Sequence, residues 1–119
     1  MADTYSDDIK RYVKIIKEAL LDKKAFDLKI IDISKISVMA DYFIIASGNN
    51  QNQIKAMCDE VDEKMSKEGV HPRQTEGYES ANWVLMDYSD IIVHVFDKEN
   101  RLFYDLERIW SDGENVLDI

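Results

Sequence analysis

Cysteine, proline and glycine are scarce in this chain of 119 residues. Cys58 is the only cysteine, so an intramolecular disulfide is excluded and the chain fits a reducing compartment. One proline and four glycines, beside 45% hydrophobic residues, are untypical of a disordered chain. Residues 1–119 are therefore expected to form a single domain, since domains of ~100–150 residues are the commonest size.

Long apolar runs are also lacking. The longest extend over about half a dozen residues, whereas a helix that spans a bilayer needs ~20. The N-terminus, Met1-Ala2-Asp3-Thr4, is acidic and polar and has no apolar core of the kind found in signal peptides. We therefore expect a soluble, cytoplasmic protein with no membrane partner.

Positive charge is in deficit. Fifteen basic residues stand against 24 acidic ones, which gives a formal net charge of −9. Such a chain is repelled by a phosphate backbone unless its cations cluster. The densest basic stretch, residues 10–24, is interrupted by Glu18 and Asp22. The charge thus disfavours direct nucleic-acid binding and favours a basic protein partner; acidity that serves only solubility is the alternative.

Three segments carry apolar residues at helical spacing. They predict helices over residues 6–21, with Ser6 as N-cap, over residues 51–68, and over residues 102–110. Residues 112–119, after the last of these, are expected to form a mobile tail.

Strands are predicted between the helices. Residues 26–33 and 41–47 are rich in apolar and β-branched side chains, and residues 83–88 and 91–96 form a hairpin pattern. Residues 71–80 are polar and hold at most a short edge strand. The order α-β-β-α-(β)-β-β-α predicts an α/β domain of the α+β kind, with helices packed on a mixed sheet.

Both faces of the predicted hairpin are apolar. Alternation places Trp83, Leu85 and Asp87 on one side of the first strand. The second strand has Ile92, His94 and Phe96 on one side and Ile91, Val93 and Val95 on the other. Trp, Tyr and Arg are typical interface anchors, and Arg101 and Tyr104 follow the hairpin. The pattern does not decide whether these aromatic residues form an interface or a core.

The sequence gives little support for a nucleophilic or a metal-dependent active site. Cys58 lies on the apolar stripe of a predicted helix and is expected to be a core residue. His71 lies in a polar loop, and His94 lies in an apolar strand, where a histidine usually donates one hydrogen bond and completes the core. Two histidines and one cysteine without close spacing do not predict a metal site, so we expect no cofactor.

The turn Ser47-Gly48 permits one enzymatic interpretation, a nucleotidyltransferase-like site. Such a site needs two carboxylates at positions i and i+2 of a strand, on one face. The best candidates, Asp105 and Glu107, lie in the segment predicted to be a helix. There, side chains at i and i+2 point ~200° apart and do not converge on one metal. We therefore predict that the chain is not an enzyme.

Several runs of residues resemble the ribosomal silencing factor (Iojap-related) family. They are residues 41–48 (DYFIIASG), 76–77 (EG) with 83–88 (WVLMDY), 90–96 (DIIVHVF) and 101–110 (RLFYDLERIW). The runs from residue 76 onward, in this order and at this spacing, are quite specific; the Ser-Gly turn alone would be weak.

The resemblance implies a nucleotidyltransferase-like core without the catalytic carboxylates. It also implies a function, because family members bind a basic ribosomal protein on the joining face of the large subunit. They thereby block association with the small subunit and repress translation, while organelle members are linked to subunit assembly.

The partner-binding positions of the family map onto Trp83 and Tyr104, with Asp105 beside it, and Leu85 and Arg101 complete the candidate site. Trp83 and Tyr104 would anchor the contact, and Asp105 would pair with a cation of the partner. Arg101 could instead hold the turn within the protein. Self-association of the apolar hairpin, which gives a homodimer, is a further alternative.

Overall fold

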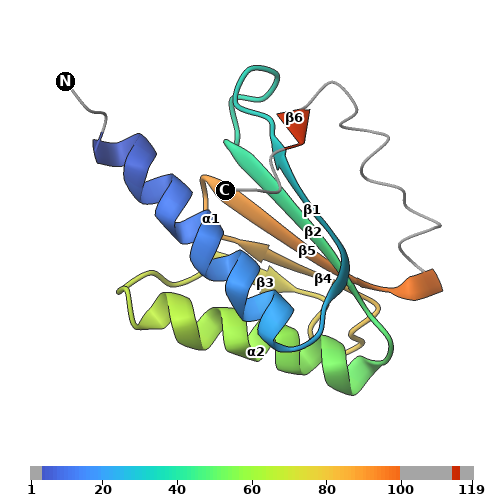
Figure 1. Cartoon of the computed structure of the whole chain (residues 1–119). Coiled ribbons are helices and arrows are strands. Elements are labelled where there is room, and N and C mark those ends of the chain that lie inside the picture. Colours follow the sequence, from blue (N-terminus) through green and yellow to red (C-terminus); the bar gives the residue numbers. More distant parts are fainter. Residues whose placement is uncertain (1–3, 100–113, 116–119) are drawn as a thin grey trace.

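The computed structural model describes residues 4–99 and 114–115. The elements in chain order are α1 (Thr4–Asp22), β1 (Phe26–Asp32), β2 (Tyr42–Gly48), α2 (Gln51–Ser66), β3 (Gln74–Glu76), β4 (Trp83–Asp87), β5 (Ile91–Asp97) and β6 (Glu114–Asn115). The predicted order is confirmed through β5 (Figure 1). The helix predicted over residues 102–110 lies outside the described residues.

The strands form one mixed sheet in the order β3-β4-β5-β2-β1-β6. Only β2 and β5 run parallel; the other neighbours are antiparallel. Both helices cover the same face of this sheet (Figure 1). This arrangement confirms the expected α+β architecture of helices on a mixed sheet. β6 lies within the predicted tail, and its two residues pair with Ile31 and Asp32 of β1.

The helix boundaries differ slightly from those predicted. α1 begins at Thr4, so Ser6 lies inside the helix and its prediction as N-cap is wrong. α2 ends at Ser66, and Gly69 follows with a φ of +75°, a left-handed conformation that suits glycine. Within the described residues, neither helix has the length and apolar character required to cross a membrane.

The start of α2 is fixed by two side chains. Asn50 caps the helix, because its Oδ1 accepts a hydrogen bond of 2.8 Å from the Gln53 backbone N–H. Gln53 in turn accepts from the Asn49 N–H at 2.6 Å and donates to the carbonyls of Lys23 and Lys24, each at 3.0 Å. One glutamine therefore joins the end of α1 to the start of α2.

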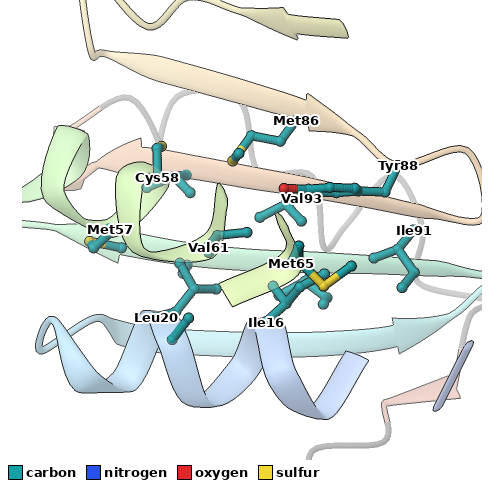
Figure 2. Packing of buried hydrophobic residues seen from close by; sticks show 14 of the residues in the cluster. Ile16, Leu20, Met57, Cys58, Val61, Met65, Met86, Tyr88, Ile91 and Val93 are labelled. Carbon is teal, nitrogen blue, oxygen red and sulfur yellow. The ribbon is translucent and has the colours of Figure 1, made fainter. Parts of the chain in front are cut away.

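The main core lies between the helices and the sheet. Side chains of α1, α2 and the central strands interdigitate there, as Figure 2 shows for Leu20, Val61 and Val93 among others. Cys58 is 2% exposed in this cluster, so its prediction as a core residue is confirmed. The structure also decides which side of the hairpin packs on the helices, namely that of Ile91, Val93 and Val95.

A second, smaller cluster lies on the opposite face of the sheet. Its buried members are Ile31, Ile33, Ala40, Phe43, Ile45 and Phe96. Trp83 and Ile92 are partly buried and pack against it. The strand β2 is consequently buried at all seven of its residues.

Two adjacent leucines at the end of α1 test the position of the core. Leu20 is fully buried, whereas Leu21 is 46% exposed. We predict that Leu20→Ala lowers the free energy of unfolding by ~2–5 kcal/mol, because it leaves a cavity. Leu21→Ala is the matched control and is expected to change it by less than ~0.5 kcal/mol. Urea unfolding measures both, and equal losses would place the core elsewhere.

Candidate partner-binding site

Trp83 lies on the face of the sheet that the helices do not cover. It opens β4 and pairs in register with Phe96 of β5, and the two rings stack with centroids 5.2 Å apart. Its indole Nε1–H donates a 3.1 Å hydrogen bond to Nδ1 of His94. Trp83 is partly exposed, so it presents apolar surface while neighbouring rings hold it in one orientation.

His94 is the acceptor of this hydrogen bond. An indole N–H can only donate, so Nδ1 carries no proton and the ring is the neutral tautomer with hydrogen on Nε2. His94 is 4% exposed, and burial lowers the pKa of its imidazole to about 4. The prediction of a core histidine is confirmed, but the expected hydrogen-bond direction is wrong, because Nδ1 accepts.

The other ring nitrogen of His94 is unusual. Among the described residues, the buried Nε2 has no hydrogen-bond partner. The ring also meets Phe43 edge-on, with centroids 4.8 Å apart. A buried donor without an acceptor costs ~1–3 kcal/mol, so this nitrogen is a group that a bound partner could satisfy.

Leu85 borders a cavity next to this aromatic array. It pairs in register with His94, on the same face of the sheet as Trp83. The cavity has a volume of about 260 Å³, and its described lining is mainly apolar, with Met39, Phe43, Leu85 and Ile92 among its walls. Trp83 and Leu85 therefore belong to one surface, as the sequence predicted from their alternation.

Carboxylates surround the cavity. Asp87 accepts a 2.8 Å hydrogen bond from the guanidinium of Arg73, while Asp90 lines the cavity beside it. Burial raises the pKa of the nearby Asp41, and the charges of Asp90 and Asp32 raise it further. The carboxylates of this region are thus close enough to repel one another, which favours a cationic neighbour.

The remaining predicted site residues are not placed. Arg101, Tyr104 and Asp105 lie outside the described residues, as do the rejected metal candidates Asp105 and Glu107. The structure therefore brings together Trp83 and Leu85, and their proximity to the other three stays a prediction.

The enzymatic alternatives gain no support from the described residues. Burial is the main cause that raises the pKa of the Cys58 thiol to about 12, so it is protonated at neutral pH and is a poor nucleophile. Ser47 is 1% exposed, and a Cβ on Gly48 would lie 2.9 Å from Ile54, so this turn is closely packed. No cluster of three potential metal ligands occurs within residues 4–99.

Sequence reasoning missed two supports of Trp83. His94 was predicted to be a core residue but not a hydrogen-bond partner of the indole. Gly77 has a φ of +81°, and a Cβ there would lie 2.1 Å from the Trp83 carbonyl oxygen. The pair Glu76-Gly77 stands in the matched motif, yet only the fold shows that Gly77 allows the backbone at Trp83 to approach.

Comparisons with known proteins agree on one family. Residues 6–119 match the family model described as "Ribosomal silencing factor during starvation". A Bacillus subtilis protein named ribosomal silencing factor RsfS is 40% identical over 104 residues, covering 87% of this chain and 88% of the relative. A relative of the same name from Halalkalibacterium halodurans is 38% identical, with 87% and 89% covered.

A solved structure agrees with the fold. The crystal structure of a protein from Chromobacterium violaceum matches with a TM-score of 0.85 and 34% identity, covering 93% of this chain and 92% of that one.

Two glycines test the support beneath Trp83. Gly77 and Gly69 both have positive φ, but only Gly77 has backbone within reach of an added Cβ. We predict that Gly69→Ala costs ~1–2 kcal/mol from backbone strain alone. Gly77→Ala should cost more than ~3 kcal/mol, because Trp83 must also move. Thermal unfolding compares them, and similar costs would show that the close approach at Gly77 relaxes freely.

The buried histidine predicts a dependence of stability on pH. Its folded pKa of about 4 lies below the ordinary histidine pKa of 6.5, so the unfolded chain binds more protons between these values. The free energy of unfolding should therefore fall as pH drops from ~6.5 to ~4, by on the order of 3 kcal/mol, and be fully restored above ~6.5.

His94→Gln is the control for this measurement, because it keeps all carboxylates and removes the titrating ring. Urea unfolding of both proteins at several pH values isolates the contribution of His94. Parallel pH curves for the two proteins would mean that His94 does not titrate in this window.

Proposed function

The chain belongs to the ribosomal silencing factor family, whose members are non-enzymatic regulators, and we propose that it binds the large ribosomal subunit and blocks association with the small one. The match over residues 6–119 supports this proposal. The observation that carries it is Trp83, a partly exposed indole locked in place by Phe96 and His94 on the helix-free face of the sheet.

We infer that this face is the interface. Trp83 and Leu85 would supply its apolar anchors, and the C-terminal segment would add Arg101, Tyr104 and Asp105. A side chain already held in one orientation loses little conformational freedom on binding, which favours affinity. Tryptophan, tyrosine and arginine are also the residues that most often dominate binding energy.

The partner that fits this face is a basic ribosomal protein. A chain with a formal net charge of −9 is attracted to a basic surface, and the carboxylates around the cavity strengthen this attraction locally. The same charge disfavours direct contact with ribosomal RNA.

The mechanism is steric. A folded body of 13.9 kDa bound to the joining face occupies space that the small subunit needs. No bond is made or broken, so repression of translation requires neither a cofactor nor a catalytic group.

We also infer that the fold is a nucleotidyltransferase-like core without its catalytic carboxylates, and that the protein acts where cytoplasmic ribosomes are found.

The proposal predicts selective binding that depends on Trp83. The purified protein should migrate with isolated large subunits, not small subunits, through a density gradient, and should reduce formation of joined ribosomes. Trp83→Ala is expected to weaken binding by about tenfold or more, as removal of an interface anchor costs ~2 kcal/mol or more. Tyr104→Ala should act in the same direction.

Leu21→Ala is the control, because it removes an exposed apolar side chain from the helix layer. Thermal unfolding establishes that each variant remains folded. Unchanged binding of Trp83→Ala would move the interface to another face. Absence of wild-type binding to large subunits, with self-association of the protein alone, would favour the homodimer instead.

A further inference from the structure

The cavity beside Trp83 has two walls from separate parts of the chain. Residues 33–40 form one wall through Ile33, Ser37, Met39 and Ala40, and the β4–β5 hairpin forms the other. Hydrogen bonds hold the first wall in shape, since Ile33 N–H donates to Asp41 O at 2.8 Å and Ser37 N–H donates to Ile33 O at 2.8 Å. The cavity is therefore a built feature of the fold.

His94 is a buried polar group of this cavity, whose described lining also holds two serines and the paired Arg73 and Asp87. His94 lines it, and with Nδ1 engaged by Trp83 the ring has only its Nε2–H left to donate. Nε2 is buried and has no partner among the described residues. A pocket with largely apolar walls and a buried, unpaired donor suits an apolar side chain that arrives with a hydrogen-bond acceptor.

The rim of the cavity indicates what kind of chain carries that side chain. Asp90 lines the cavity. The pKa of the nearby Asp41 is raised by burial and by the negative charges of Asp90 and Asp32. Arg73, the one cation among the described lining residues, is paired with Asp87 at 2.8 Å. Basic residues on both sides of an inserted apolar side chain would therefore be attracted.

Exposed apolar residues widen the same surface. Met39, which lines the cavity, is 84% exposed, and its chain neighbour Val38 is 104% exposed. Apolar side chains this exposed, next to an apolar pocket, are typical of a protein-binding site.

We propose that the cavity between residues 33–40 and the β4–β5 hairpin receives an apolar side chain from a basic segment of the ribosomal partner, and that His94 Nε2–H donates to an acceptor of that segment. This inference rests on the proposed function and deepens it. His94 thus has two roles: one nitrogen positions Trp83, and the other contacts the partner.

The cavity is tested by filling it. Ser37→Trp places an indole in the lining, whereas Ser34→Trp places the same side chain on the same loop, at a position that does not line the cavity. We expect Ser37→Trp to weaken binding to large subunits about tenfold or more and Ser34→Trp to change it less than twofold. Equal effects of the two variants, whether both weak or both strong, would overturn the role of the cavity.

The donor is tested by a pair of amide variants. His94→Asn offers an oxygen near the position of Nδ1 and can still accept from Trp83, but it does not reach the position of Nε2. His94→Gln reaches that position with an N–H. The proposal expects the glutamine variant to bind large subunits at least fivefold tighter than the asparagine variant. The reverse order would mean that His94 only positions Trp83, and equal affinities would mean that its Nε2–H makes no contact with the partner.

Two further readouts separate the possible failures. Thermal unfolding and the Trp83 indole N–H resonance show whether each variant is folded with its indole held. Wild-type protein that fails to bind large subunits overturns the proposed function and this inference together. If the wild-type protein binds and all the cavity variants bind equally well, only the inference is overturned. The inference is also overturned if Ser37→Trp loses only self-association, because a second copy of the chain would then be the occupant of the cavity.

Discussion

The parallel pairing of β2 with β5 is the constraint on which the rest of the structure depends. All seven residues of β2 are buried, so both faces of the sheet centre must be covered. The two helices cover one face, and Gln53 joins their ends so that they pack as one layer. The other face is a smaller apolar cluster with aromatic rings at its edge. The fold thus uses its two sides differently: one holds the main core, and the other is the face proposed for partner contact.

The shape of the face proposed for contact depends on the residues packed behind it. Trp83 opens β4, and its ring is fixed by stacking on Phe96 and by donation to His94. His94 can accept because its ring is neutral, and burial, which lowers its pKa to about 4, keeps it neutral in mildly acidic solution as well. Gly77 permits the close backbone approach at Trp83 that a larger residue would prevent. The exposed anchor is therefore supported by residues that are buried or closely packed, which explains how a small domain can present a rigid aromatic surface.

The sequence predicted the repeating features of the fold well, because they arise from local periodicity. The apolar stripe of α2 and the alternation in β4 and β5 gave the elements and the two sides of the hairpin. It could not show which side meets the helices, since both are apolar. Nor could it show the indole–imidazole bond, because Trp83 and His94 are eleven residues apart and meet only through the β4–β5 register. The wrong N-cap at Ser6 reflects the uncertainty of helix ends.

Among the described residues, Cys58 and His94 could in principle perform chemistry, but both are buried. Burial keeps Cys58 protonated and His94 uncharged at neutral pH, so one is a packing group and the other a neutral hydrogen-bonding group. A catalytic side chain, in contrast, has to be accessible and either charged or able to change its charge near neutral pH. The helix-free face instead presents the indole of Trp83, a largely apolar cavity and nearby carboxylates. In the proposed function, this surface recognises a basic protein and obstructs the small subunit, and that role requires of the fold only a rigid face.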